Sequence, residues 1–149
     1  LNLLQEIELG FNECIKSGRK LWGVFPVENH FFMKNEISYD FKFCGGWLWG
    51  CIVDKQCLLV NTDQYEDYER SIRHYIKYGG MVRLNFICCK TKYRNEGGMG
   101  IERDFEVAQK YLQTTYPNLF YLKKKKDILN PVLKDMRKGE ELEKKLEDY

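Results

Sequence analysis

Apolar residues recur at helical spacing through the first fifteen positions of the chain. This spacing predicts a helix that runs to about Ser17, where Gly18 supplies a C-terminal cap. The chain starts inside the pattern and without Met, so we expect it to begin within a longer protein, the alternative being a processed or trimmed N-terminus. The apolar stripe consists of Leu3, Leu4, Ile7, Phe11, Cys14 and Ile15.

The pattern then changes to strand-like runs. Leu21 to Val27 is predicted to be a buried strand, interrupted by its proline, and a loop follows from Glu28 to Asp40. Phe41 to Val53 is predicted to be the next strand, in which the pair Gly45-Gly46 permits a bulge or a close backbone approach. Leu58 to Val60 is a candidate for a further short strand.

Helical and strand-like patterns alternate in the second half. Helix-start residues from Asn61 predict a helix to about Tyr78, which Gly79-Gly80 ends. Met81 to Tyr93 alternates as a strand, the glycine-rich loop Arg94 to Gly100 follows, and a helix is predicted for Arg103 to Thr115. The remaining elements are a short strand at Phe120 to Leu122 and a charged helix or tail at Pro131 to Tyr149.

The predicted order is therefore α β β α β α β α. This order indicates an α/β (α+β) layered domain, with one mixed sheet and helices packed on it. We assign residues 1–130 to this domain and 131–149 to the charged C-terminal helix or tail. Neither a dinucleotide-binding glycine motif nor a P-loop is present.

Composition narrows the class of protein. The chain has 149 residues, of which 44% are hydrophobic and 31% charged, as in an ordinary single globular domain. Its 24 Lys and Arg against 22 Asp and Glu give a net charge of +2, which excludes a histone-like electrostatic binder of nucleic acid. No run is apolar enough to cross a bilayer and no signal peptide is visible, so we expect a cytoplasmic protein without membrane contact.

Six cysteines raise the alternatives of disulfides, zinc or free thiols. The absence of a signal peptide and the sizeable core argue against a disulfide framework. No C-x-x-C pair exists and only two histidines could join the cysteines, so the spacing does not match a structural zinc site. Reduced, mostly buried thiols of an intracellular protein are the better account. The cysteines are Cys14, Cys44, Cys51, Cys57, Cys88 and Cys89.

Acidic residues gather where the second helix is predicted to start. They are Asp63, Glu66, Asp67 and Glu69. The first interpretation is helix capping, since carboxylates at a helix N-terminus are stabilised by its dipole. The second is a general base that accepts a proton from a hydroxyl, with Asp67 and Glu66 as the candidates. The dipole would lower the pKa of such a carboxylate.

Three further features could bind a ligand or nucleic acid. The backbone N–H groups of Gly97 and Gly98, with Lys92 and Arg94 nearby, could hold a phosphate ahead of a helix, and the alternative is a plain connection. Trp47 and Trp49 share one strand face, which either belongs to the core or stacks on a sugar or base. The lysine run 123–126 is either a solvated edge or a phosphate contact.

Several segments together resemble the C-terminal half of a GT-A-fold glycosyltransferase, in particular the TET-associated glycosyltransferase group. The resemblance covers about Leu3 to Leu122. It is carried by the runs GVFPVENHFFMK, FKFCGGWLWGCI, YEDYERSIRHY, VRLNF and EGGMG.

The resemblance implies roles for individual residues. Glu66-Asp67 match an acidic motif whose carboxylate deprotonates the acceptor in inverting members, which implies Asp67 as the base and Glu66 as its alternative. The loop with Gly97 and Gly98, together with Lys92 and Arg94, would bind the donor phosphates. The acceptor would lie against Asn29, Trp47 and Trp49. The family's Asp-x-Asp metal motif is absent here, so ligands for Mn²⁺ or Mg²⁺ are expected mainly outside this chain.

Three functions follow as hypotheses. The first is transfer of a sugar from a nucleotide-sugar donor to a hydroxyl acceptor, with a modified nucleic-acid base as one candidate acceptor. The second is a non-enzymatic module that binds single-stranded nucleic acid through aromatic and lysine side chains. The third is a viral structural or assembly module, in which Glu66 and Asp67 would be inert.

Overall fold

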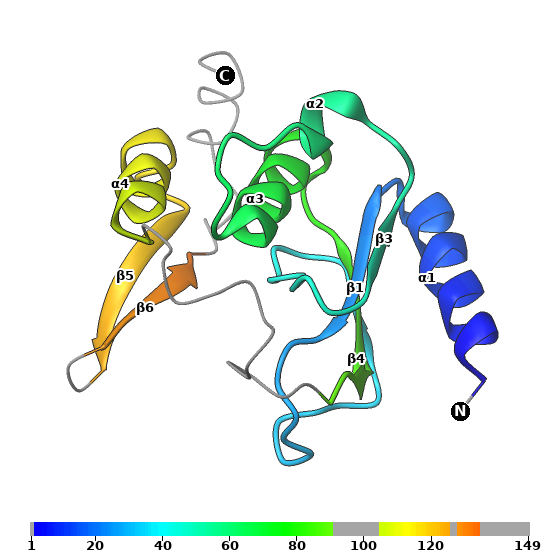
Figure 1. The fold of residues 1–149 in the computed structure, drawn as a ribbon. Coiled ribbons are helices and arrows are strands. Elements are labelled where there is room, and N and C mark those ends of the chain that lie inside the picture. The colour runs from blue at the N-terminus through cyan, green and yellow to red at the C-terminus, as the bar shows by residue number, and fades with distance from the viewer. Residues whose placement is uncertain (1, 91–104, 126–127, 135–149) are drawn as a thin grey trace.

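The computed structural model describes residues 2–90, 105–125 and 128–134 (Figure 1). Its centre is a four-stranded sheet in the order β2-β4-β1-β3, and a separate two-stranded sheet is formed by β5 and β6. Helix α1 lies on one side of the central sheet and α3 on the other (Figure 1). The chain is thus a mixed α/β structure with helices packed on a mixed sheet, as the sequence predicted, although β5 and β6 form a second sheet where one sheet was predicted.

Parallel and antiparallel pairs meet in the central sheet. Strand β1 (Leu21–Phe25) pairs in parallel with β4 (Val82–Cys88) and antiparallel with β3 (Trp49–Cys51). Strand β2 (Ile37–Ser38) pairs antiparallel with the other side of β4. The parallel pair is joined through α3, which places the helix N-terminus at the sheet edge where the parallel strands end.

Helix α1 (Leu3–Ser17) covers one face of this sheet. Gly10 permits the close contact, because a Cβ at this position would collide with the indole of Trp22. The helix ends at Gly18, whose φ of 70° is the left-handed conformation that glycine adopts without strain. Buried residues from both elements share this side of the core: Cys14, Trp22, Val24, Val82, Leu84 and Ile87.

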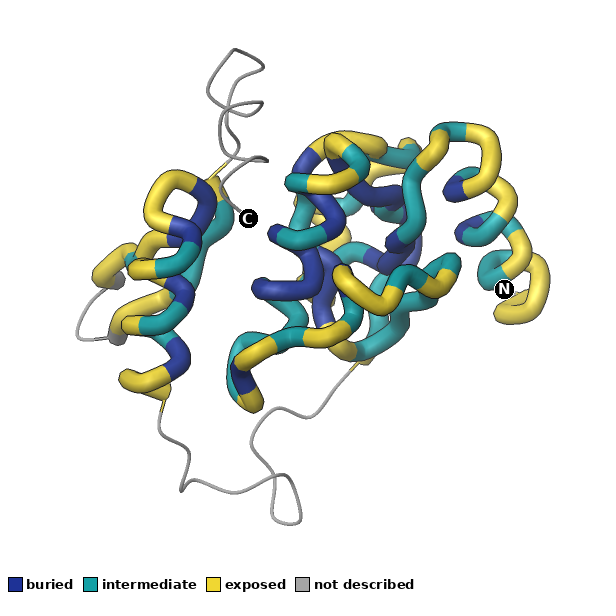
Figure 2. Tube along the Cα trace, turned by 90° about the horizontal axis from the view of Figure 1, so that it is seen from above, coloured by how far each residue is buried: buried dark blue, intermediate teal, exposed yellow. Residues whose placement is uncertain are grey.

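Helix α3 (Glu66–Tyr78) covers the opposite face and ends at Gly79, with φ 73°. The Tyr75 ring stacks on Phe41 with centroids 4.0 Å apart, and Ile72 is fully buried beside them. A short helix, α2 (Lys55–Leu58), precedes α3. These buried side chains form the second half of the core (Figure 2).

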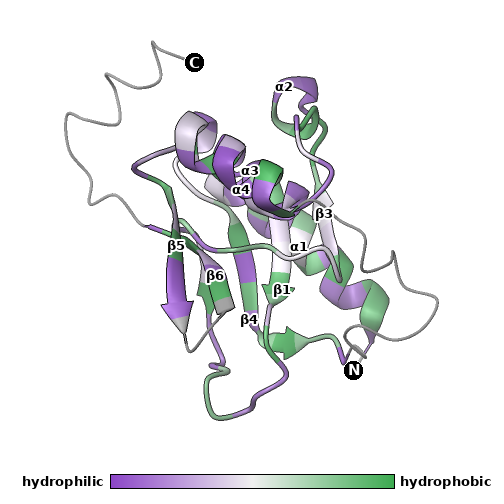
Figure 3. Cartoon of the chain, turned by 60° about the vertical axis from the view of Figure 1, so that its left-hand side comes forward, coloured by the Kyte–Doolittle hydropathy of each residue, from purple (hydrophilic) through white to green (hydrophobic). Residues whose placement is uncertain are grey.

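Helix α4 (Phe105–Thr115) and the hairpin of β5 (Phe120–Lys125) and β6 (Ile128–Leu133) form a further layer beyond α3. Leu112 and Phe120 belong to the same buried cluster as Ile72, so this layer shares the α3 side of the core. Strand β5 changes from hydrophobic to hydrophilic along its length (Figure 3), because it runs into the lysines.

The structure corrects several predicted boundaries. Of the strand predicted for 41–53, only Trp49–Cys51 is a strand, because the residues before it turn toward α3 instead of pairing. The predicted strand at 58–60 is wrong, since Leu58 ends α2, and the strand predicted for 81–93 ends at Cys88. The helix predicted from Pro131 is also wrong at its start. Pro131 lies in β6 opposite Leu122, and the rest of that prediction lies outside the described residues.

None of the helices in the described ranges is both long enough and apolar enough to cross a membrane.

Candidate functional site

The N-terminus of α3 holds the irregular segment that precedes β3. The Gly46 N–H donates to Asp67 Oδ2 at 3.3 Å, and the Cys44 N–H donates to Ser71 Oγ at 3.2 Å. The other carboxylate oxygen of Asp67 accepts the N–H of Tyr68 at 2.9 Å. Asp67 is therefore held by two backbone donors, one of which lies 21 residues earlier in the chain.

Burial dominates the ionisation of Asp67. It raises the pKa of this carboxyl to about 6, and the negative charge of Glu66 raises it further, against the opposing effects of Arg70 and of the two backbone N–H groups. The sequence analysis predicted the opposite direction from the helix dipole, and that prediction is wrong. The loss of hydration under residues 44–46 outweighs the dipole.

Arg70 lies one helical turn after Asp67. Its guanidinium carbon sits 3.9 Å from the ring centroid of Trp49, and the residue is only 7% exposed. Its Nε and Nη2 atoms are buried and have no hydrogen-bond partner among the described residues. Burial lowers the pKa of Arg70 while the charges of Asp67 and Glu66 raise it, and an arginine remains charged under such opposing effects.

Glu69 behaves differently, although it belongs to the same acidic cluster. It is fully buried, and its Oε1 accepts Arg73 Nε at 3.1 Å and Arg73 Nη2 at 2.9 Å. The hydroxyls of Tyr111 and Tyr116 donate to the same oxygen, at 2.9 and 3.1 Å. Its Oε2 accepts the Asn61 N–H at 2.7 Å. Glu69 thus ties α3 to α4 and to the loop before α3, which is a structural role.

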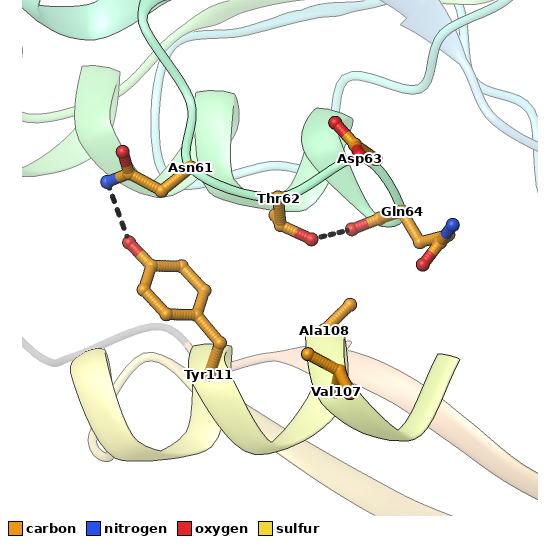
Figure 4. Close-up of a pocket in the computed structure, with 7 residues that line it drawn as sticks. All are labelled: Asn61, Thr62, Asp63, Gln64, Val107, Ala108 and Tyr111. Atoms are coloured by element: carbon orange, nitrogen blue, oxygen red, sulfur yellow. Dashed lines mark hydrogen bonds between the residues drawn. The ribbon is translucent and has the colours of Figure 1, made fainter. Parts of the chain in front are cut away.

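A cavity of about 400 Å³ lies beside this network, between the loop before α3 and helix α4 (Figure 4). The Asn61 side chain donates to the Tyr111 hydroxyl at 3.0 Å, and the Thr62 hydroxyl donates to the Gln64 carbonyl at 2.6 Å. The first of these bonds joins the loop to α4 across the cavity, and the second lies within the loop. Its lining residues are Asn61, Thr62, Asp63, Gln64, Val107, Ala108 and Tyr111.

The structure brings only some of the predicted site residues together. Glu66, Asp67 and Trp49 meet at the start of α3 through Arg70. Trp47 packs edge-on against Phe43, with centroids 6.1 Å apart. Asn29 instead accepts the N–H of Phe31 and closes a turn in an exposed loop. The predicted phosphate-binding residues Lys92, Arg94, Gly97 and Gly98 lie outside the described residues.

Two residues at the site were missed by the sequence analysis. The sequence contained one signal for Arg70: it comes three residues after Asp67, and two residues with this spacing lie on the same side of a helix. His74 carried none. It is fully buried, its Nδ1 lies 2.8 Å from the Arg70 carbonyl oxygen, its Nε2 has no partner within the described ranges, and burial lowers its pKa.

Metal ligands are not assembled in this part of the molecule. Within residues 2–90, 105–125 and 128–134, no three His, Cys, Asp or Glu side chains form a group that could hold an ion. The six cysteines are all free thiols. Burial raises the pKa of Cys44 to about 12, so this thiol is unreactive near neutral pH.

Comparison of the chain with models of protein families, with curated proteins and with solved structures finds no match in any of the three.

Proposed function

We propose that this chain is the acceptor-side part of a glycosyltransferase that moves a sugar from a nucleotide-sugar donor to a hydroxyl, with Asp67 as the general base. The observation that carries the proposal is the placement of Asp67 at the start of α3, where Gly46 and Tyr68 donate to its two carboxylate oxygens and burial raises its pKa to about 6. A carboxylate with a pKa near the working pH is ionised at neutral pH and is a stronger base than an ordinary one. The resemblance to the acceptor half of a GT-A fold supports this assignment.

The chemistry assigned to Asp67 is one proton transfer. Its carboxylate takes the proton of the acceptor hydroxyl as that oxygen attacks the anomeric carbon of the sugar. The bond from this carbon to the diphosphate breaks, and the nucleoside diphosphate leaves with the electron pair. Glu66 lies next in the chain and keeps the site negative. The described residues form no metal site, so no step here is assigned to Mn²⁺ or Mg²⁺.

The test is the variant Asp67→Asn in a transfer assay, with Asp63→Asn as the matched control, because Asp63 is exposed in the loop just before α3. We expect Asp67→Asn to lose about 10²–10⁴-fold in turnover with donor binding unchanged. Wild-type transfer should fall as the pH drops through about 6, where Asp67 takes up its proton. Unchanged turnover of Asp67→Asn would remove this residue as the base.

A second candidate function, binding of single-stranded nucleic acid, is favoured by a different observation. Phe31 and Phe32 are 87% and 59% exposed on the loop after β1, with their rings edge-to-face at 5.2 Å. Exposed aromatic rings can stack on bases. Binding that weakens steeply with salt and is lost in Phe31→Ala, in a protein without transfer activity, would favour this function over the first.

The six free thiols support placing the protein in a reducing compartment such as the cytoplasm.

A further inference from the structure

Two arginines on α3 use the same chemical group in different ways. The edge of the Arg73 guanidinium formed by Nε and Nη2 is occupied by Glu69 Oε1, at 3.1 and 2.9 Å. The same edge of Arg70 has no hydrogen-bond partner among the described residues. Arg70 is also the more buried of the two, at 7% exposure, whereas Arg73 is half-buried. Arg70 therefore lacks hydrogen-bond partners at this edge and is also less accessible to water, which could otherwise take their place.

An unpartnered buried guanidinium is costly and calls for an explanation. The Trp49 ring supports its face, but a ring leaves the N–H groups of the edge unsatisfied. Asp67 and Glu66 supply negative charge nearby without donating or accepting a hydrogen bond with Arg70. Two parallel N–H donors match two oxygens of one phosphate or carboxylate group.

The start of α3 adds an independent reason to expect an anion. The helix has 13 residues and no side chain caps its first residue, since Tyr65 precedes it in the left-handed conformation with φ 57°. The N-terminal end of a helix carries partial positive charge and exposes backbone N–H groups. Asp67 already accepts the Tyr68 N–H of this end. Arg70 is one turn away, so a group that reaches its edge also lies close to the helix end.

We propose that Arg70 binds a phosphate group of the acceptor, beside the hydroxyl that Asp67 deprotonates. The proposal rests on the proposed function, because it is Asp67 that places the acceptor here. One helical turn separates the two side chains, so a group on Arg70 lies next to the acceptor oxygen. The acceptor is then a phosphorylated compound, such as a nucleotide within a nucleic-acid strand.

Binding requires a local opening. Nε and Nη2 are inaccessible to solvent, and the segment before β3 is fastened to α3 by the two hydrogen bonds from Cys44 and Gly46. A shift of this segment, or of Trp49 at the start of β3, is therefore required to expose the edge. The titratable groups that face Arg70 are Glu66 and Asp67 on α3 and the thiols of Cys44 and Cys51. Of these, the two carboxylates oppose an incoming phosphate.

The experiment measures binding of three probes to the full chain by calorimetry and by tryptophan fluorescence. The probes are inorganic phosphate, a short oligodeoxythymidylate for the acceptor, and a nucleoside diphosphate for the donor. The variants are Arg70→Met, Arg70→Lys, which keeps the charge and removes the paired donors, and Asp67→Asn. The matched control is Lys110→Gln, an exposed cation on α4.

We expect Arg70→Met to weaken binding of phosphate and oligonucleotide by about tenfold or more, Arg70→Lys to weaken it less, and Lys110→Gln to leave it unchanged. Asp67→Asn should bind more tightly, because it removes a like charge, and this holds even if Arg70→Met fails to fold. Equal binding by wild type and Arg70→Met, no binding of any probe to the wild type, or no tightening in Asp67→Asn would overturn the proposal. Arg70-dependent binding of the nucleoside diphosphate alone would overturn the assignment to the acceptor.

The failure of this inference is distinct from that of the proposed function. Arg70-dependent binding in a protein whose Asp67→Asn variant transfers normally would keep the phosphate site and remove the base. Loss of transfer in Asp67→Asn without Arg70-dependent binding would keep the base and remove the phosphate site.

Discussion

Two carboxylate and arginine pairs on α3 differ in how their hydrogen bonds are satisfied. Glu69 and Arg73 bond to each other, and Glu69 also accepts two tyrosine hydroxyls and a backbone N–H. Asp67 and Arg70 do not bond to each other. Asp67 accepts two backbone N–H groups and its pKa is raised, while the Nε and Nη2 atoms of Arg70 have no partner within the described ranges.

The comparison separates stability from function within one helix. A buried charge with all of its hydrogen bonds made contributes to the fold, and breaking the pair is costly. A buried charge that lacks partners costs stability unless a ligand supplies them. We therefore assign Glu69 and Arg73 to the structure, whereas the unpartnered edge of Arg70 and the raised pKa of Asp67 support the roles proposed for these two residues.

The largest expected effect is on stability in Glu69→Gln. The neutral amide leaves the Arg73 charge without its counter-charge. One of the two acceptor oxygens also becomes an NH2 donor, which must face either the Asn61 N–H or the donors at Oε1. We expect the free energy of unfolding to fall by about 3–5 kcal/mol, measured by urea denaturation. Glu106→Gln, on the exposed start of α4, is the control and should change little. Equal urea midpoints for Glu69→Gln and wild type would break the comparison.

A smaller effect of opposite sign is expected for Asp67→Asn. Folding raises the pKa of Asp67 from 3.8 to about 6, so the folded state binds more protons between these values and this group destabilises the fold as the pH rises through them. Asparagine removes the cost of the buried charge and loses one accepted hydrogen bond. We expect it to stabilise the protein at pH 8 by about 1–2 kcal/mol.

The pH dependence provides the control for this effect. The gain from Asp67→Asn should shrink as the pH is lowered from 8 to 4, because the wild-type carboxyl is then protonated in the folded state as well. Thermal unfolding at both pH values measures the difference. A variant that is less stable than wild type at pH 8 would show that Asp67 is a structural charge like Glu69.

The smallest expected effect on stability concerns the hydrogen-bond network of Glu69, which is the structural pair of the comparison. Tyr111→Phe removes one hydroxyl that donates to Glu69 and accepts from the Asn61 amide. We expect a loss of about 1 kcal/mol in the free energy of unfolding, because the remaining donors still satisfy Glu69. Tyr121→Phe, on the partly exposed β5, is the matched control with no expected change. A loss in Tyr111→Phe as large as in Glu69→Gln would mean that the network depends on this one hydroxyl.

Local sequence signals were sufficient for the main helices and for the type of sheet. The apolar stripe and Gly18 predicted α1, and Gly79 predicted the end of α3. These signals failed where contacts with residues far away in the sequence determine the local structure. Residues 41–48 have strand-like composition but bond to α3 through Ser71 and Asp67. Pro131 indicated a new helix, yet it lies on an edge strand, where a missing N–H is tolerated.

Of the candidate site, the sequence predicted the acidic start of the helix but not the electrostatics of its carboxylates. The acidic helix start singled out Glu66 and Asp67, but the direction of the Asp67 pKa shift depends on burial by a segment about twenty residues earlier. The sequence also could not separate Asp67 from Glu69, because the partners of Glu69 lie in the loop before α3 and more than forty residues later in and after α4. Both differences arise from tertiary contacts.

The most direct test of the account is the titration of Asp67 itself. Gly46 donates to its carboxylate, so the Gly46 amide signal reports the ionisation in an NMR titration of the wild-type chain, with Asp67→Asn as the blank. The account predicts a midpoint near pH 6 that disappears in Asp67→Asn. A midpoint at or below the ordinary value of about 4 would contradict it, because Asp67 would then be a weak base at the start of a helix.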